Sequence, residues 1–271
     1  MITKIIKNLK RPHLIPQKIF SKVLNFYYEN SYKSSKYIDE QNQFFKKLNF
    51  DREKALIKLD DIKKKYNFLA TPMSSEHQTI FSSISETKKV DQILEIGTHD
   101  GTNSFLLSKL FPKAKITTID LKDNEDEFMK IYGRNSINKL KEFCDKRDKI
   151  LSETNINFEQ TNSVNLSFSE KKYDLIWIDG AHGYPVVTID IINSIRLINE
   201  DGIILCDDIF TKPPKIQDSM YDSIAAYETL NELKKANVIS YNLLYKRLDK
   251  KNNSNPNTRQ FLAFVKKNIN L

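Results

Sequence analysis

The chain has 271 residues, which suffices for one large domain or one domain with an appendage. No apolar run approaches the ~18 residues of a membrane span, and the basic segment Lys4 to Arg11 is not a secretory signal. The net charge of +8 does not indicate nucleic-acid binding, because lysines and acidic residues alternate along the whole chain and no basic aromatic groove is evident. Cys144 and Cys206 are too few for a disulfide framework, so a reduced, cytoplasmic protein is expected.

Residues 1–70 are predicted to form an appended helical region. Pro16 can open a first helix, whose apolar stripe comprises Ile19, Phe20, Val23, Leu24 and Tyr27. Asp51 can cap a second helix, with an inner face of Leu56, Leu59 and Ile62. Ordinary packing of these helices on the core is the favoured interpretation. A substrate lid, a surface for a homo-oligomer and a basic contact with a membrane surface are the alternatives.

The second predicted unit covers residues 71–271 and begins with Thr71-Pro72, which breaks the helical pattern. Ser75 with Gln78 fits a capping box for the next helix, whose inner stripe comprises Ile80, Phe81 and Ile84. His77, at the start of this helix, is expected to be structural or exposed rather than catalytic.

The stretch from Gln92 to Leu121 reads as strand, glycine turn, helix, strand and acid, which is typical of a nucleotide-binding half of an α/β sheet. The turn has the form Glu95-x-Gly97-x-x-x-Gly101. A dinucleotide fingerprint needs a glycine where this chain has the bulky His99, so the pattern argues against an NAD-dependent oxidoreductase. Asp120, at the end of the second strand, can accept hydrogen bonds from ribose hydroxyls.

This turn resembles the first motif of class I S-adenosylmethionine-dependent methyltransferases, in the catechol O-methyltransferase-like and sugar O-methyltransferase branch (methyltransferase family 24-like). The resemblance implies a Rossmann-like α/β fold, with a seven-stranded, mostly parallel sheet and a C-terminal antiparallel hairpin. It also implies that Thr71-Pro72 belongs to a segment that closes over the cofactor, S-adenosylmethionine. The residues implied in cofactor binding are Glu95, Gly97, Thr98, Gly101, Asn103, Ser104, Asp120, Leu121, Ser163 and Asp179.

The connection from Asp120 to Ser163 is longer than one crossover helix needs. Gly133 is expected to break it, and a later helix is expected to bury Ile137, Leu140, Phe143 and Ile150. The insertion is a candidate wall of the acceptor site, with Tyr132 and Arg134 as candidate contacts. The third strand is predicted at 156–160, just before Asn162-Ser163.

The fourth predicted strand, 173–178, ends at Asp179, and the fifth, 203–206, ends at Asp207-Asp208. Because ligands in an open parallel sheet bind beyond the carboxyl ends of the strands, these acids are expected to converge. Three neighbouring carboxylates repel one another unless a cation joins them, and hard oxygen ligands suit Mg²⁺ or a similar divalent ion. A polar rim without metal is the alternative. The spacing from Asp179 to Asp207 also resembles that of the metal carboxylates in catechol O-methyltransferase-like enzymes. In those enzymes an Asp-Asn pair ends the fifth strand, whereas this chain has Asp207-Asp208.

His182 follows Asp179 by three positions, in an Asp-x-x-His arrangement that resembles sugar and antibiotic O-methyltransferases. With an unperturbed pKa of about 6.5, a histidine can take a hydroxyl proton at neutral pH. His182 and Asp179 are therefore the predicted catalytic residues, with a cofactor contact as the alternative role of His182. A final helix is predicted over 218–238 and a β-hairpin over 240–246 and 259–265. The stiff Lys212-Pro213-Pro214 loop is expected to frame the acceptor.

Together these features predict an S-adenosylmethionine-dependent O-methyltransferase, assisted by a divalent metal, that methylates a hydroxyl of a small molecule such as a sugar or glycan precursor. A metal-independent N- or O-methyltransferase is one alternative. A non-catalytic cofactor-binding or scaffold protein is the alternative from another class.

Overall fold

The structure is a computed structural model that describes residues 15–67, 75–130, 134, 136–152, 156–213 and 222–268. The predicted contributions of Thr71-Pro72, Tyr132, Gly133 and Pro214 fall outside the described residues. Within the described part of the chain, no helix is long and apolar enough to cross a membrane.

A seven-stranded sheet forms the centre of the molecule, in the order β3-β2-β1-β4-β5-β7-β6. The first five strands of this order are parallel, and β7 runs antiparallel to both β5 and β6. The strands are β1 Gln92–Ile96, β2 Lys115–Asp120, β3 Ile156–Gln160, β4 Tyr173–Ile178, β5 Ile198–Phe210, β6 Ile239–Tyr245 and β7 Gln260–Lys267. The predicted Rossmann-like fold with a C-terminal antiparallel hairpin is confirmed. The order reverses direction between β1 and β4, which places a ligand crevice at their carboxyl ends.

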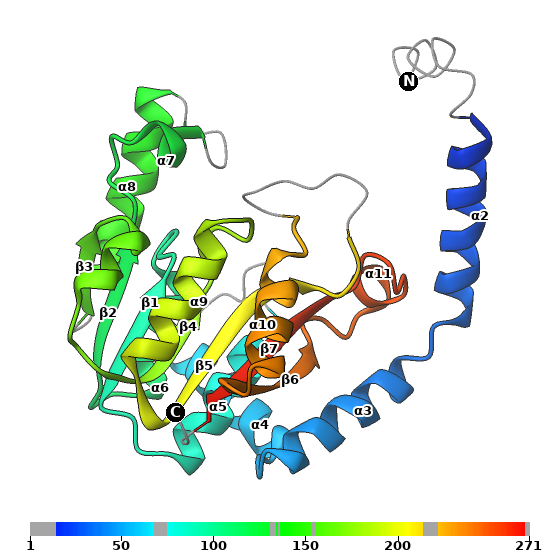
Figure 1. Ribbon diagram of the computed structural model, residues 1–271, viewed down its shortest axis with the longest axis horizontal. Helices are drawn as coiled ribbons and strands as arrows, with labels where there is room; N and C mark the ends of the chain where they lie inside the picture. The colour runs from blue at the N-terminus through cyan, green and yellow to red at the C-terminus, as the bar shows by residue number, and fades with distance from the viewer. Residues whose placement is uncertain are drawn as a thin grey trace.

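Helices cover both faces of the sheet, so the molecule has three layers (Figure 1). On one face lie α4 (Arg52–Lys65), α5 (His77–Thr87) and α6 (Thr102–Leu110), and on the other α9 (Val186–Leu197) and α10 (Ala225–Lys235). Strand β4 serves both cores, because successive side chains alternate: Leu175 and Trp177 join one cluster, and Ile176 and Ile178 the other. Burial of each such side chain stabilises the fold by roughly 1.5–3 kcal/mol.

Helix α5 buries the predicted stripe of Ile80, Phe81 and Ile84. The predicted capping box is wrong, because the Ser75 hydroxyl hydrogen-bonds Nδ1 of His77 and no side chain caps the helix. The ring of His77 packs on Trp177 with a centroid distance of 5.1 Å. Burial lowers the pKa of His77 to about 3, which is consistent with the predicted structural role.

The N-terminal helices differ in how they pack. Helix α3 (Ser34–Lys47) and α4 bury Phe45, Ala55 and Leu59, and Asp51 caps α4 as predicted by accepting from the Lys54 amide at 3.0 Å. Helix α2 (Ile15–Ser31) instead stands away from the body of the molecule (Figure 1). Its exposed apolar residues are Phe20, Val23, Phe26 and Tyr27, each more than 60% accessible. The favoured packing on the core is therefore wrong for α2, because α3 and α4 already cover this side of the core.

Side-chain hydrogen bonds join the helical region to the sheet. Gln41 of α3 is fully buried; its Oε1 accepts from the Tyr245 amide at 3.0 Å and its Nε2 donates to the Tyr245 carbonyl at 3.1 Å. Arg52 of α4 donates to both carboxylate oxygens of Glu76, at 2.7 and 2.9 Å. The Glu76 amide in turn donates to the carbonyl of Lys246 at 2.9 Å. These bonds fix the end of β6 and the start of α5 against the N-terminal helices.

The insertion after β2 forms α7 (Asp126–Lys130) and α8 (Ile137–Ser152), which stand together at the upper left of Figure 1. The predicted inner stripe of α8 is wrong at Ile137, which is 86% exposed. The residues that α8 buries are Arg147 and Leu151. Arg147 donates to both oxygens of Asp123, at 2.6 and 2.9 Å, so an ion pair joins the half-buried Leu140, Phe143 and Ile150 on the face of α8 that packs inward.

Strand β5 is longer than predicted and contains Asp207 and Asp208 instead of ending at them. The pairing register with β7 shifts between Cys206 and Ile209, and Asp208 has a left-handed φ of 53°. Pairing therefore continues beyond the acids, and the irregularity changes the direction in which their side chains point. The last large helix, α10, begins at Ala225, later than predicted. The short elements are the 3₁₀-helix η3 (Ser163–Phe168) and α11 (Lys250–Asn253).

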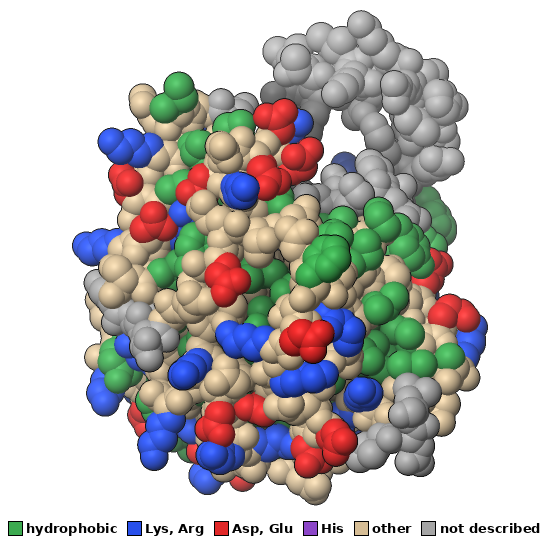
Figure 2. Space-filling view, turned by 60° about the vertical axis from the view of Figure 1, so that its left-hand side comes forward, with side chains coloured by type: hydrophobic (Ala, Val, Ile, Leu, Met, Phe, Trp, Pro, Cys, Tyr) green, Lys and Arg blue, Asp and Glu red, His purple; other side chains and the backbone are tan. Residues whose placement is uncertain are grey.

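Charged side chains are mixed on the surface. On the face shown in Figure 2, lysine and arginine side chains lie among aspartate and glutamate side chains instead of forming a continuous basic surface. This distribution agrees with the interleaved charges of the sequence.

Candidate active site

The glycine turn lies where β1 and β4 meet. The Gly97 amide donates to the Ile119 carbonyl at 2.9 Å, and its φ of +99° is one that side-chain-bearing residues rarely adopt. A Cβ at Gly97 would lie 2.2 Å from the Asp179 carbonyl oxygen. The turn therefore contacts the backbone at the start of the β4 loop directly, and only glycine permits this approach.

Neutral donors hold the carboxylate of Glu95, which is fully buried. It accepts hydrogen bonds from Asn103 at 2.8 Å, from Thr118 at 2.6 Å and from the Ser104 hydroxyl. Burial raises the pKa of Glu95, and these donors oppose that rise. Three of the predicted cofactor residues thus form one hydrogen-bonded group that fastens α6 to β1. Their contact with the cofactor stays a prediction.

Backbone amides of the two flanking loops bind Asp120, at the end of β2. Its oxygens accept from the His99 amide at 2.9 Å and from the Leu121 amide at 2.8 Å. Burial raises the pKa of Asp120 more than these bonds lower it. The Thr98 hydroxyl lies 2.7 Å from that of Thr118. Gly97, Thr98, Asp120 and Leu121 therefore lie at one end of the sheet.

Ser163, predicted beside the adenine, starts η3. Asn162 caps this short helix by accepting from the Val164 amide at 3.0 Å. Asp190 of α9 is completely buried, and its carboxylate lies near Ser163, without a cation beside it among the described residues. Burial raises its pKa to about 6, an effect that the nearby Ser163 only partly offsets.

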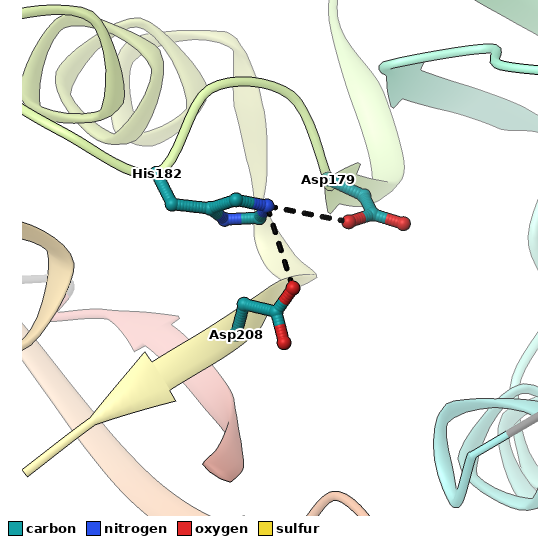
Figure 3. A group of neighbouring side chains, drawn as sticks. All are labelled: Asp179, His182 and Asp208. Atoms are coloured by element: carbon teal, nitrogen blue, oxygen red, sulfur yellow. Dashed lines mark ion pairs between the residues drawn. The ribbon is translucent and has the colours of Figure 1, made fainter. Parts of the chain in front are cut away.

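Asp179, His182 and Asp208 converge at the carboxyl ends of β4 and β5 (Figure 3). Nε2 of His182 lies 3.5 Å from Oδ2 of Asp208 and 3.9 Å from Oδ1 of Asp179. The His182 side chain is 9% exposed, whereas 37% of the Asp179 side chain remains accessible. Burial raises the pKa of the Asp179 carboxyl well above its ordinary value, and the charge of the neighbouring Asp207 adds to this effect. The imidazole is thus flanked by two carboxylates at the predicted rim.

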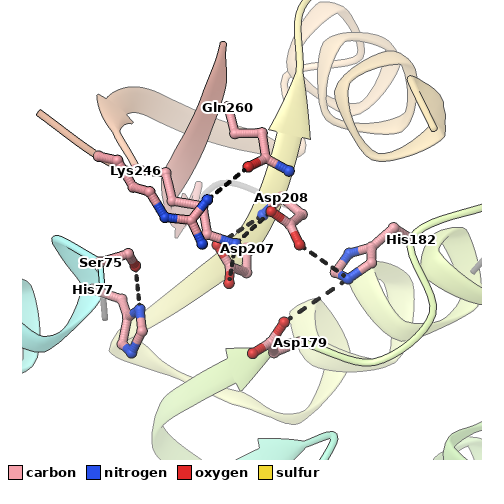
Figure 4. Close-up of polar contacts among 9 residues, drawn as sticks. Ser75, His77, Asp179, His182, Asp207, Asp208, Lys246 and Gln260 are labelled. Atoms are coloured by element: carbon pink, nitrogen blue, oxygen red, sulfur yellow. Dashed lines mark hydrogen bonds and ion pairs between the residues drawn. The ribbon is translucent and has the colours of Figure 1, made fainter. Parts of the chain in front are cut away.

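Lys246, which directly follows β6, is a member of this group that the sequence did not reveal (Figure 4). Its Nζ lies 2.8 Å from Oδ2 of Asp207 and also donates to Oδ1 of Asp208. Burial opposes the charged ammonium, but the attraction of the carboxylates outweighs it and raises the pKa of Lys246. A lysine at the end of a predicted strand is ordinarily solvated. Only the register of β6 on β7, and of β7 on β5, could have indicated that Lys246 meets the acids of β5.

The predicted metal ligands do not all face one another. Both oxygens of Asp207 are engaged, one by Lys246 and the other by the Asp208 amide at 2.8 Å. Three other side chains, Asp179, His182 and Asp208, each offer one ligand atom, and these atoms lie within 4.8 Å of one another. Two carboxylate oxygens and one imidazole nitrogen form a donor set that fits a divalent cation.

Arg134 lies near Asp120, and its predicted contact with the acceptor stays a prediction. Its guanidinium packs over the rings of Phe128 and Phe143, at 3.8 and 4.1 Å from the ring centroids. Its charge lowers the pKa of Asp120, against the larger opposing effect of burial. The insertion therefore contributes to the side of the site where Asp120 lies.

Comparison with known proteins places this geometry in context. Residues 94–209 match the family model of a methyltransferase domain. This segment runs from β1 into β5 and contains the glycine turn, Asp120, Asp179, His182 and both acids of β5, whereas Lys246 lies beyond it. No curated protein matches the chain in sequence.

Three solved structures share the fold at low sequence identity. Cofactor-bound Rv0187 from MTB is 15% identical, with 79% of this chain and 89% of that chain covered and a TM-score of 0.51. A putative O-methyltransferase from Klebsiella pneumoniae is 12% identical, with 87% and 99% covered and a TM-score of 0.50. The O-methyltransferase TomG from Streptomyces achromogenes, in complex with SAM, is 11% identical, with the same coverage and TM-score. Residues 94–209 therefore match a methyltransferase domain, and the chain shares the fold of these solved structures.

Proposed function

We propose that this chain is a methyltransferase that transfers the methyl group of S-adenosylmethionine to a hydroxyl oxygen of a small-molecule acceptor, with Nε2 of His182 as the general base. The observation that supports this proposal is the position of His182 between two carboxylates. Asp179 joins the two parts of the proposed site, because its carbonyl oxygen contacts Gly97 of the glycine turn and its carboxylate faces His182. The O-methyltransferases among the structural neighbours agree with an oxygen acceptor.

Bound S-adenosylmethionine supplies an electrophilic methyl group on a positively charged sulfur. His182 accepts the hydroxyl proton as the new oxygen–carbon bond forms and the carbon–sulfur bond breaks. Asp208 stabilises the resulting imidazolium, because its Oδ2 lies 3.5 Å from Nε2. The predicted cofactor residues, from Glu95 to Asp179, would orient the donor so that acceptor and methyl group are in line.

Divalent-metal assistance is the second candidate mechanism, and the proximity of three donors supports it. Asp179 and Asp208, with His182 as a third ligand, would hold the ion, which would lower the pKa of the acceptor hydroxyl. The two mechanisms compete for one atom, because Nε2 of His182 cannot bind a cation and accept a proton at the same time. A polar acceptor such as a sugar suits a rim of carboxylates and imidazole in either case.

The remaining proposals concern the appended region. The exposed apolar side chains of α2 support the prediction of a homo-oligomer formed through the N-terminal helices. The division near residue 70 and the cytoplasmic location stay predictions.

The test is methyl transfer to a panel of sugars, other polyols and phenols, measured by S-adenosylhomocysteine release with and without EDTA. His182→Ala should reduce kcat by about 10²–10⁴-fold while leaving the affinity for S-adenosylmethionine unchanged. His77→Gln, which removes a histidine outside the proposed machinery, should keep kcat within a few-fold. Unchanged turnover in His182→Ala would contradict the assignment of the base.

A further inference from the structure

We propose that the Lys246 ammonium is the resident cation of the acidic group, holding Asp208 toward His182 and making an added divalent ion unnecessary. This inference rests on the proposed function, since it concerns how the same site is charged. It is carried by the contacts of Lys246 with Asp207 and Asp208, both of which were predicted as metal ligands.

Most carboxylate oxygens of Asp207 and Asp208 already have a hydrogen-bond partner. Lys246 and the Asp208 amide occupy both oxygens of Asp207. Lys246 also occupies Oδ1 of Asp208, which leaves Oδ2 to face His182. The three acids that would have to share a metal therefore present only part of their oxygens, because Lys246 and the Asp208 amide already hold the others (Figure 4).

The fold determines where the ammonium of Lys246 lies. The side chains of Lys246 and Asp207 are each 5% exposed, so water does not screen their attraction effectively. The Lys246 amide donates to the Gln260 carbonyl at 3.1 Å, and its carbonyl accepts from the Glu76 amide at 2.9 Å. With its backbone bonded on both sides, Lys246 delivers a positive charge to a fixed point.

Lys246 reduces the net negative charge of the acidic group formed by Asp179, Asp207 and Asp208. Asp179, Asp207 and Asp208 carry three negative charges when ionised, and Lys246 reduces the sum by one. Without the ammonium, mutual repulsion would favour uptake of a cation from solution. Lys246 is therefore a positioning residue, which acts through Asp208 on the proposed base.

The experiment compares wild type with Lys246→Met, which keeps an apolar stem and removes the charge. Wild-type methyl transfer should be unchanged by EDTA within twofold. Turnover of Lys246→Met in EDTA should fall at least tenfold and recover in part with Mn²⁺ or Mg²⁺. Its affinity for Mn²⁺, measured by electron paramagnetic resonance without donor or acceptor, should exceed that of wild type at least tenfold.

Two further variants separate charge from structure. Lys246→Arg keeps the cation and should retain turnover in EDTA. Asp207→Asn/Lys246→Met has the same net charge as wild type, avoids a buried unpaired charge, and should bind Mn²⁺ no more tightly than wild type. Circular dichroism at the assay temperature verifies folding. If Lys246→Met unfolds, turnover of the double variant tests the positioning role: it should fall at least tenfold in EDTA, because the ammonium that holds Asp208 is gone, and wild-type turnover in the double variant overturns the inference.

The possible results distinguish a failure of this inference from a failure of the proposed function. Loss of wild-type turnover in EDTA overturns the inference but leaves methyl transfer standing. Equal Mn²⁺ affinity in wild type and a folded Lys246→Met also overturns it. Absence of methyl transfer with every acceptor contradicts the proposed function instead, and the Mn²⁺ measurements still test the role of Lys246 as resident cation.

Discussion

Two groups of buried carboxylates at the same end of the sheet are stabilised by different chemistry. Glu95 is surrounded by neutral donors, which engage both of its oxygens. Asp207 and Asp208 are held by one ammonium, and Oδ2 of Asp208 is left facing His182. Neutral donors thus hold the carboxylate beside the glycine turn. The ionic group of Lys246, Asp207 and Asp208 also holds its side chains in place, but it leaves Oδ2 of Asp208 without a bond to the ammonium.

The largest expected effect on stability comes from the ionic group. Removing one partner of a buried ion pair leaves an uncompensated charge, so Lys246→Met should lower the free energy of unfolding by about 3–5 kcal/mol. Lys171→Met is the control for an exposed lysine without an ionic partner among the described residues, because Lys171 donates to the neutral hydroxyl of Thr117, at 2.7 Å, and lies over the ring of Tyr173. Urea titration measures both variants. If both variants lost the same free energy of unfolding, the ion pairs of Lys246 would contribute no more to stability than the contacts of Lys171.

Asp190 is a third buried carboxylate, which has no cation beside it among the described residues and only the neighbouring Ser163 to offset the effect of burial. Its pKa rises from 3.8 unfolded to about 6 folded, so the stability that the protonated form contributes is complete below pH 3.8 and is lost as pH rises through 6. Asp190→Asn should therefore stabilise the fold by about 3 kcal/mol at pH 7.5 and by about half of that at pH 5. Urea titrations at the two pH values measure this gain, and a pH-independent gain would contradict the prediction.

The smallest effect is expected at Glu95. Thr118→Val removes one of its donors and should cost about 1–3 kcal/mol, because the two remaining donors still engage the carboxylate. Thr117→Val is the control from the same strand, since the Thr117 hydroxyl accepts from Lys171 and does not contact Glu95. The measurements are urea unfolding and calorimetric affinity for S-adenosylmethionine. A cost as large as that of Lys246→Met would show that the two groups are equally sensitive.

Local pattern sufficed for much of the sheet, because buried parallel strands appear as short apolar runs that end at glycine or an acid. The first four strands and the hairpin lie where these runs predict them, and the convergence of Asp179 with Asp208 follows from the parallel pairing of β4 and β5. The pairing of Lys246 with Asp207 depends on the register between β5, β7 and β6, which links residues that are 39 positions apart. Short-range periodicity carries no information about such a register.

Other differences also arise from tertiary contacts. The irregular pairing at Asp208 extends β5 beyond the acids, although the sequence there reads as a strand end. The apolar stripe of α2 predicts burial, yet α3 and α4 already cover the core on that side. In both places the local signal is correct and the competing contacts of distant segments decide the outcome.

The amide of Gln41 has a consequence beyond packing. Strand β6 is one of the two edge strands of the sheet, and the outward backbone groups of Tyr245 bond to this side chain as they would bond to the peptide of another strand. Exposed sheet borders recruit foreign chains and start aggregation. By imitating one residue of a neighbouring strand, the glutamine of α3 covers the edge where β6 ends, so this helix blocks the pairing of another chain there.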